Sequence, residues 1–365
     1  MRSSYSKEDV ILLLKDITGL VEPQSTEERE RQIQAGRHYC EMLPIEYVPS
    51  QEYMRVYEES LAIYADSVAE AIGRLAEKII AERGKNVVLV SLARAGIPIG
   101  ILLKRYIKKR YQTEVAHYSI SIIRGKGIDD QAMQYLLKHY KPENLMFVDG
   151  WVGKGAILHE LQKAISAYEG VSPEIAVVAD PAYVTRLCGT HEDILIPSAC
   201  LNSTVCGLVS RTFLRDDIIK PGDFHGAVYY GELKDADLSY EFIHTIEAAF
   251  SYPEKENVEK KELCEQETHT AFEIEHLTNP GMEEVKAIAK EFDIQDINLV
   301  KPGIGEATRV LLRRVPWKIL IAEDGMEQKE LAHLIRLAKE KHVPVCTYPL
   351  KHYKACGLIK KIADA

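Results

Sequence analysis

Two stretches of the sequence decide the fold: residues 86–100, NVVLVSLARAGIPIG, and residues 145–157, LMFVDGWVGKGAI. Each begins with an apolar run of strand length, passes through a turn of small residues and continues with a helical pattern. Strands that are apolar on both faces are typical of a parallel sheet covered by helices on both sides. The same alternation recurs between residues 115 and 196. The sequence therefore predicts a doubly wound α/β domain.

The apolar spacing also predicts where the other elements of this domain lie. Ser6 to Asp9 precede five apolar residues and have the pattern of a capped helix start, so a helix is expected there. The remaining predictions are helices over residues 53–82, 98–110, 129–140 and 155–168, and strands over residues 86–91, 115–123, 145–149, 174–179 and 193–196.

The end of the chain reads as a second, smaller unit. Residues 251–269 nearly lack large apolar side chains and are dense in charge, which indicates a linker. We expect a first domain over residues 1–250 and an α/β/α domain over residues 270–365. Its predicted helices span residues 282–292, 306–314 and 328–342, and its predicted strands span residues 297–300, 317–322 and 343–347.

The composition narrows the protein class. Hydrophobic residues make up 46% and charged residues 28%, as in globular proteins, and no apolar run is long enough to cross a bilayer. The first residues lack the apolar stretch of a secretory signal, and the seven cysteines form no CxxC pair. We therefore expect reduced thiols in a cytoplasmic protein, without a disulfide framework or a structural zinc site. The net charge is −9, yet residues 281–365 carry 15 Lys and Arg against 12 Asp and Glu.

Cationic turns follow three of the predicted strands. In an open α/β sheet, ligands bind beyond the carboxyl ends of the strands. Arg94 follows the first strand, Arg124 and Lys126 lie on a glycine-rich loop after the second, and Lys154 follows the third. Four cations at one edge favour a polyphosphate ligand, although Arg124 and Lys126 could equally be solvated surface charges.

The third turn carries the most information. Asp149 ends a buried strand, and the glycines after it open a helix whose free N–H groups can hold a phosphate. The turn is not a Walker A loop, because position 148 is Val where the first Gly would fall and position 155 is Gly instead of Ser or Thr. A purely structural alternative is that Asp149 only caps the helix.

These segments resemble known families. Residues 87–100, the Arg124 loop and residues 147–157 look like the pyrophosphate, flexible and ribose-phosphate loops of type I phosphoribosyltransferases. The string DGWVGKGA at residues 149–156, with IPSACLNST at residues 196–204, resembles a narrower family. Its members are phosphoribosyltransferase-like proteins of bacterial tellurium- and stress-resistance gene neighbourhoods, also labelled cysteine protease StiP, and they carry a C-terminal Pelota-type RNA-binding domain.

The resemblance implies an enzyme that transfers phosphoribose from phosphoribosyl pyrophosphate with Mg²⁺. Asp149 would hold the ribose hydroxyls and favour Mg²⁺ binding, while Arg94, Arg124 and Lys126 would neutralise the departing pyrophosphate. The N-terminal helices and residues 214–250 would form a hood. The other implied contacts are Ala93, Ala95 and Gly96 for the pyrophosphate, Gly150, Trp151, Gly153, Lys154, Gly155 and Ala156 for the ribose-phosphate loop, and Cys200, Asn202 and Ser203 for the acceptor pocket.

One departure from the pattern concerns Asp149. Type I enzymes place two acidic residues together at this strand end, whereas here Asp149 is followed by Gly150 and then by bulky Trp151.

The string GIGEATR at residues 303–309 resembles the Pelota and kink-turn-binding ribosomal protein superfamily. The resemblance implies that Gly303, Gly305 and Glu306 meet extruded RNA bases, and that Arg309 and Arg313 reach phosphates. Gly305 stands where an Asn is common. Alternatively, residues 309–314 form a solvated helix face and Glu306 only complements the helix dipole.

Two further functions stay open beside phosphoribosyl transfer. The first is a nucleotide-sensing, RNA-binding protein without turnover. The second is a cysteine protease in which Cys200 is the nucleophile, with Asn202 nearby in sequence and His191 or His225 as the base. Against this, cysteine is often simply a buried packing residue.

Overall fold

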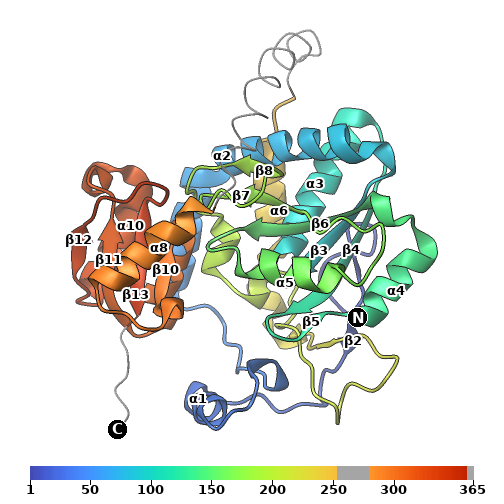
Figure 1. Cartoon of the computed structure of the whole chain (residues 1–365), viewed down its shortest axis with the longest axis horizontal. Coiled ribbons are helices and arrows are strands. Elements are labelled where there is room, and N and C mark those ends of the chain that lie inside the picture. Colours follow the sequence, from blue (N-terminus) through green and yellow to red (C-terminus); the bar gives the residue numbers. More distant parts are fainter. Residues whose placement is uncertain (253–278, 360–365) are drawn as a thin grey trace.

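The computed structural model describes residues 1–252 and 279–359, so the predicted linker lies almost entirely outside the described residues (Figure 1). Residues 1–252 form an α/β domain, and residues 279–359 form a smaller α/β domain that packs against it.

The first domain is built on a sheet that has seven strands in the described part of the chain, and the prediction of a mainly parallel α/β sheet is confirmed. The strand order is β1-β4-β3-β6-β7-β8, and all of these neighbours are parallel. The seventh strand, β5, pairs antiparallel with the last residues of β4. The chain runs outward from β3 to β4, then returns to the other side of β3 at β6, so the sheet has its switch point between β3 and β6. The strands are β1 (Ile11–Leu12), β3 (Val88–Ala93), β4 (Ala116–Ile123), β5 (Gly127–Ile128), β6 (Leu145–Trp151), β7 (Ile175–Ala179) and β8 (Cys188–Thr190).

Helices cover both faces of this sheet (Figure 1). On one face lie α2 (Gln51–Arg83), α3 (Gly96–Tyr111) and α6 (Ser239–Ala248), and on the other lie α4 (Asp130–His139) and α5 (Ala156–Ile165). Two separate apolar cores result, because side chains alternate along each strand. In β3, for example, Leu89 packs toward α2 and α3, whereas Val88 and Val90 pack toward α4 and α5.

Two sequence predictions in this domain are wrong. The chain after Ser6 forms a short turn and then β1, because the apolar residues Ile11 and Leu12 pair with β4 at the edge of the sheet. Residues 193–196 are not a strand: the seven-stranded sheet ends at β8, and residues 193–196 lead into a 3-10 helix at Pro197–Cys200. The carboxylate of Asp193 is instead bonded to the second domain.

A small lobe beside the sheet corresponds to only part of the predicted hood. It is organised by the short pair β2 (Lys15–Asp16) and β9 (Gly226–Ala227) around a separate apolar cluster that includes Phe213. Helix α1 (Thr26–Gln34) lies below the body of the domain in Figure 1. Since α6 packs on α2 and α3 behind the sheet, residues 214–250 do not all cover the carboxyl edge.

The second domain contains a four-stranded sheet in the order β10-β13-β11-β12. Strand β13 is antiparallel to both of its neighbours, and β11 and β12 are parallel. Its elements are α8 (Pro280–Glu291), β10 (Val300–Pro302), α9 (Ile304–Arg313), β11 (Pro316–Ile321), α10 (Ala332–Glu340), β12 (Val345–Thr347) and β13 (Ala355–Ile359).

The two domains share one apolar core. Leu195 and Ala199 of the first domain belong to the same buried cluster as Ile304, Leu311 and Leu334 of the second. Ion pairs surround this contact, for example Arg336 with Glu59 at 2.6 Å and Arg55 with Glu340 at 2.9 Å. A large apolar interface of this kind fixes the relative position of two domains. Within the described residues, no helix is long and apolar enough to cross a membrane.

Candidate functional site

The turn after β3 lies tightly against β6. Ala93 ends β3, Ala95 follows in the turn, and Gly96 is the first residue of α3. A Cβ added at Gly96 would lie 2.4 Å from the backbone oxygen of Val148. Only glycine fits this close approach, so the small residues that the sequence singled out here set the packing of the switch point.

Asp149 lies at the carboxyl end of β6, as predicted. Its Oδ1 accepts a hydrogen bond from the N–H of Gly150 at 2.8 Å. Burial raises the pKa of this carboxyl group to about 7, although that hydrogen bond and the charge of Arg309 oppose the shift. A carboxyl group with such a pKa can exchange a proton near neutral pH.

The side chain of Arg94 makes hydrogen bonds with residues that follow β8 in the chain. Its guanidinium donates to the backbone oxygen of Val209 at 3.1 Å and to Oδ1 of Asn202 at 2.9 Å. Asn202 lies between the 3-10 helices Pro197–Cys200 and Ser203–Val205, and the N–H of Ser203 donates to Glu46 at 3.3 Å. The structure thus places Arg94 in direct contact with Asn202, which Ser203 follows in the chain.

The glycine-rich turn between β6 and α5 is in contact with the second domain. Nζ of Lys154 donates to the backbone oxygens of Ile297 at 2.8 Å and Val300 at 3.1 Å, and burial lowers its pKa to about 8. The hydroxyl of Tyr353 donates to the backbone oxygen of Gly153 at 2.8 Å. Gly155, at φ 82°, precedes α5, and Ala156 is its exposed first residue.

The loop after β4 is bound through its backbone. The carboxylate of Glu160 accepts from the N–H groups of Gly125 at 2.8 Å and Gly127 at 3.1 Å. The guanidinium of Arg124 donates to Oδ1 of Asn298 at 3.2 Å, whereas Lys126 is exposed on the surface.

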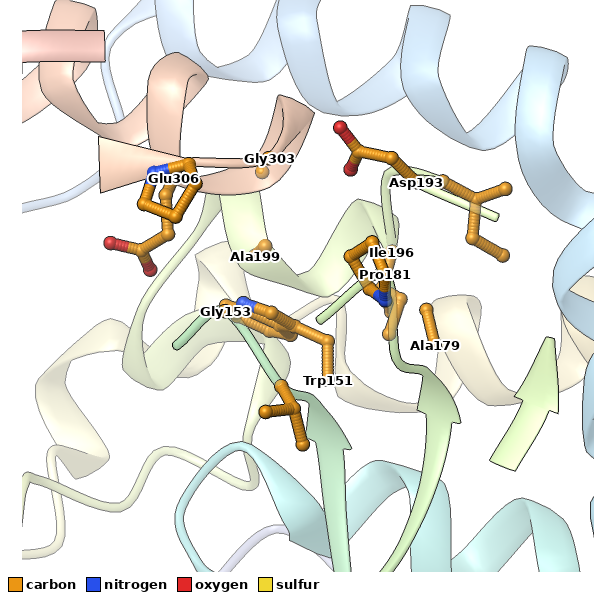
Figure 2. Close-up of a pocket in the computed structure, with 13 residues that line it drawn as sticks. Trp151, Gly153, Ala179, Pro181, Asp193, Ile196, Ala199, Gly303 and Glu306 are labelled. Carbon is orange, nitrogen blue, oxygen red and sulfur yellow. The ribbon is translucent and has the colours of Figure 1, made fainter. Parts of the chain in front are cut away.

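A narrow pocket lies between the domains (Figure 2). Its volume of about 10 Å³ is room for about one water molecule. Asp149, Arg94 and Lys154 do not line this pocket, and each is bonded to a different partner. The residues that line the pocket are Trp151, Val152, Gly153, Ala179, Pro181, Asp193, Ile194, Ile196, Ala199, Pro302, Gly303, Gly305 and Glu306.

The residues assigned to RNA lie at the interface with the first domain, although the side chain of Arg309 remains 38% exposed. Gly303, Gly305 and Glu306 line the pocket, and the guanidinium of Arg309 lies 5.8 Å from the ring centre of Trp151. Arg313 donates to Oδ1 of Asn202 at 2.7 Å and to the backbone oxygen of Cys200 at 2.8 Å. In this arrangement Arg313 is not available to an RNA phosphate.

Asp193 joins the two domains, and it is not among the predicted site residues. Its carboxylate accepts from the N–H of Ile304 at 3.0 Å and from the N–H of Lys354 at 2.8 Å, so it caps α9 from the other domain. Burial raises its pKa to about 6, against these bonds. No local signal marks Asp193, since its partners lie more than 100 residues away.

Cys200 is poorly placed to be a nucleophile. It is fully buried, its sulfur lies 3.8 Å from the hydroxyl of Ser60, and burial raises the pKa of its thiol to about 11. The two imidazoles proposed as its base bond elsewhere: His225 to Ser121 and His191 to Asp180. Cys200 therefore lacks, within the described residues, the imidazole that its catalytic role would require.

A different thiol lies against an imidazole at the end of β8. Sγ of Cys188 is 3.4 Å from Nε2 of His191, and Nδ1 of the same ring donates to the backbone oxygen of Asp180 at 2.8 Å. The Asp180 carboxylate lies 3.8 Å from Nδ1, and the ring of Tyr183 stacks on His191 at 4.1 Å. The three-residue spacing of Cys188 and His191 is a sequence signal that the prediction overlooked.

The described residues hold no group of three or more His, Cys, Asp or Glu side chains that could bind a metal ion. A magnesium ion is often held by one or two carboxylates together with ligand phosphates. Asp149 offers one such carboxylate, so a fit to Mg²⁺ depends on phosphates supplied by a ligand.

Comparisons with solved structures give partial likenesses. A hypoxanthine-guanine phosphoribosyltransferase from Bacillus anthracis is 17% identical, over 34% of this chain and 77% of that one, with a TM-score of 0.27. A hypothetical protein from Neisseria gonorrhoeae with bound ppGpp is 15% identical, over 32% of this chain and 68% of that one, with a TM-score of 0.24. Neither likeness is extensive enough to support a conclusion about this chain.

Comparisons of sequence are more informative. The family described as "PELOTA RNA binding domain" matches residues 279–361, and the family described as "Tellurite-like stress resistance cysteine protease StiP" matches residues 3–247. A protein of Acinetobacter baylyi named "Cysteine protease StiP" is 33% identical over 374 residues, which cover 98% of this chain and 94% of that protein. The chain therefore belongs to the StiP family, with a Pelota-type domain at its C-terminal end.

Proposed function

We propose that this chain is a cysteine peptidase whose nucleophile is Cys188. The description of the family and the name of the Acinetobacter baylyi relative support a thiol peptidase. The observation that carries the proposal is the row formed by the Cys188 thiol, the His191 imidazole and the Asp180 carboxylate. A nucleophile, a base and a third group that orients the base are what thiol catalysis requires.

The hydrogen bonds of His191 determine which ring nitrogen can take the proton of the Cys188 thiol. Because Nδ1 donates to a backbone oxygen, its proton stays on Nδ1, and Nε2 presents a lone pair to the thiol of Cys188. Nε2 takes the thiol proton as the sulfur attacks the amide carbon, and it returns that proton to the departing amine. Water then hydrolyses the thioester. The Asp180 carboxylate stabilises the imidazolium that forms in between.

Substrate access requires the segment around Tyr183 to open. Cys188 is only 1% exposed, and the Tyr183 ring that covers His191 is itself in contact with His352 of the second domain, at 5.6 Å between ring centres. Ala179 and Pro181, which flank Asp180, line the pocket between the domains. A peptide would enter along this edge of the pocket.

The test uses the full chain with a quenched fluorescent peptide library, followed by mass spectrometry of the iodoacetamide-alkylated protein. Cys188→Ala should lower kcat/KM by at least about 10³-fold, and His191→Gln should do nearly the same. Cys200→Ala is the matched control, because it removes another buried thiol of the same domain, and it should keep the activity. Full activity in Cys188→Ala, or loss of activity only in Cys200→Ala, would overturn the assignment.

Phosphoribosyl transfer from phosphoribosyl pyrophosphate with Mg²⁺ is a second candidate. It is favoured by the position of the Asp149 carboxyl group at the switch point between β3 and β6, where α/β proteins place their ligands. Diphosphate release in the presence of Mg²⁺ and a panel of bases, abolished in Asp149→Asn, would support it. Tight binding of phosphoribosyl pyrophosphate without release would favour the nucleotide-sensing alternative.

The Pelota-type match also supports a structured RNA as a partner of the second domain. Its assigned residues Gly303, Gly305 and Glu306 also line the pocket between the two domains.

A further inference from the structure

The residues of the second domain that are assigned to RNA are bordered by the first domain. Gly303, Gly305 and Glu306 line the pocket together with Trp151 of the first domain (Figure 2). Because the two domains share one apolar core, they stay packed against each other when a ligand binds to their surface. An RNA that reaches the partly exposed Glu306 must therefore also meet side chains of the first domain.

Arg124 is the cation of the first domain that contacts this part of the second domain. Its Nη1 and Nη2 both donate to Oδ1 of Asn298, each at 3.2 Å. Asn298 lies just before β10, where Lys301 is the middle residue, and this strand leads directly into Gly303. The exposed guanidinium of Arg124 thus lies beside the strand that carries the RNA-assigned turn.

The loop that carries Arg124 is fixed through its backbone. Each N–H group from residue 124 to residue 127 has an acceptor. These acceptors are the hydroxyl of Tyr39 for Arg124 at 3.0 Å, the carboxylate of Glu160 for Gly125 at 2.8 Å and for Gly127 at 3.1 Å, and the backbone oxygen of Ile123 for Lys126 at 2.9 Å. A binding group on such a loop needs little further ordering when its ligand arrives.

The cations on this side of the two domains are only partly balanced by carboxylates. Among the described side chains, Arg124, Lys301 and Arg314 form no ion pair with a carboxylate, whereas Glu306 is bonded to Arg309 at 3.2 Å. Burial lowers the pKa of Lys301, a shift that Glu306 opposes. The guanidinium groups of Arg314, Arg309 and Arg124 add to this shift by repulsion, so cations of both domains act on the same strand.

We propose that one surface, built by both domains, binds the phosphate backbone of a structured RNA. This cationic surface consists of Arg124 of the first domain and Lys301, Arg309 and Arg314 of the second. A phosphate gives Arg124 an ionised acceptor in place of the neutral Oδ1 of Asn298, and such hydrogen bonds are shorter and stronger. Contacts of this kind hold the RNA in position without reading its sequence.

The inference rests on RNA as the proposed partner of the second domain and adds where on the chain that RNA lies. It gives Arg124 a role different from contact with a diphosphate, because the fixed loop presents this side chain toward the second domain. The RNA-binding surface is therefore complete only in the chain that carries both domains.

The test measures binding of a labelled kink-turn RNA to the full chain by fluorescence anisotropy over a range of salt concentrations. Arg124→Gln should weaken binding by about 5-fold or more and flatten the dependence of log K on log salt concentration by about one unit. Arg124→Lys keeps the charge and should restore most of the slope. Combined with Arg314→Ala, Arg124→Gln should flatten it by about two units, since the two side chains contact separate phosphates.

Lys141→Gln is the matched control. It removes one charge from a side chain that is 79% exposed and that precedes β6, at the opposite edge of the sheet, so the slope should stay unchanged. Since Arg124 is exposed, its variants should keep the thermal midpoint of the parent chain.

Four outcomes would overturn the proposal. An unchanged slope in Arg124→Gln would remove the first domain from the RNA surface and leave the RNA partner standing, whereas no binding of the RNA to the parent chain would remove both. Equal losses in Arg124→Gln and Lys141→Gln would reduce the effect to net charge. Competition by poly-L-glutamate as strong as that by unlabelled RNA would identify a surface for acidic proteins instead.

Discussion

Asp149 and Asp193 hold their protons more tightly than exposed aspartates do. Burial raises the pKa values of their carboxyl groups to about 7 and about 6. Each group binds more protons in the folded protein than in the unfolded chain at mildly acidic pH. The free energy of unfolding therefore falls as the pH rises from about 4 through these values.

Asp149→Asn should raise the thermal midpoint at pH 8 and change it little at pH 5. The amide cannot ionise, and its oxygen can still accept the Gly150 N–H. Differential scanning fluorimetry at the two pH values measures the effect.

Asp16 provides a control with the opposite sign. Its hydrogen bond with Arg2 holds the pKa of the Asp16 carboxyl group well below its usual value. Asp16→Asn should therefore lower the midpoint to a similar extent at pH 5 and pH 8, because the stabilising charge is present at both. A pH-independent effect of Asp149→Asn would contradict the burial argument.

The sequence could predict which side chains stand at the sheet edge, but not what they contact. Asp149 is predictable as a residue of the sheet edge because the apolar run of β6 ends next to it, and a glycine-rich turn and a helix follow. The contacts of Arg94 depend on Asn202 and Val209, more than 100 residues away. The pairing of Cys188 with His191 is not predictable in this way, because β8, which carries Cys188, is only three residues long and has no apolar run that marks it as a strand.

At the scale of elements, the packing of α3 against β6 depends on Gly96. A Cβ at this position would meet the backbone oxygen of Val148 at 2.4 Å, so α3 would have to shift. Gly96→Ala should lower the free energy of unfolding by about 1–3 kcal/mol. Urea denaturation followed by circular dichroism measures the loss.

Gly150→Ala is the matched control for this packing. Its added Cβ would find its nearest neighbour at 3.8 Å, which is ordinary contact. A loss in Gly150→Ala as large as that in Gly96→Ala would show that any alanine in these turns is harmful and that the close approach is not the cause.

Two adjacent arginines at the C-terminal end of α9 are expected to contribute differently to RNA binding. Arg313 is bonded to Asn202, whereas Arg314 is exposed. If RNA binds to the docked chain, Arg314→Ala should flatten the dependence of log K on log salt concentration by about one unit. Arg313→Ala should leave this slope unchanged. Fluorescence anisotropy with a labelled kink-turn RNA measures the two slopes. A flatter slope in Arg313→Ala but not in Arg314→Ala would mean that α9 leaves the interface when RNA binds.

The elements were predictable where their pattern is long and regular. Helix α2 was expected over residues 53–82 and spans residues 51–83, because its apolar stripe repeats over many turns. Strand β1 is not predictable from its own residues, since only two of them pair and the strand that they pair with is β4, more than 100 residues away. Strand β13 was overlooked because its small residues Ala355 and Gly357 resemble a loop when their packing against α9 is unknown.

At the scale of the whole molecule, the shared core makes the two domains one folding unit. Ile304 and Leu311 of the second domain complete a cluster that begins around α2 and α3. The full chain should therefore unfold in a single calorimetric transition, with equal van't Hoff and calorimetric enthalpies.

Removal of the second domain should accordingly harm the first. A chain of residues 1–252 would expose the apolar surface around Leu195 and Ala199, and should bind the dye ANS and melt without a cooperative transition. Two separate transitions in the full chain, or a cooperative melt of the shortened chain, would show that the domains fold independently.

The chain also carries an optical reporter of its own. Its two tryptophans lie in contrasting surroundings: Trp151 forms a wall of the pocket beneath Arg309, and Trp317 lies partly exposed on β11. With Trp317→Phe as background, emission intensity and wavelength would come from one indole at the junction of the two domains. Occupation of the junction, or movement of α9 away from it, would thus become visible without any attached label.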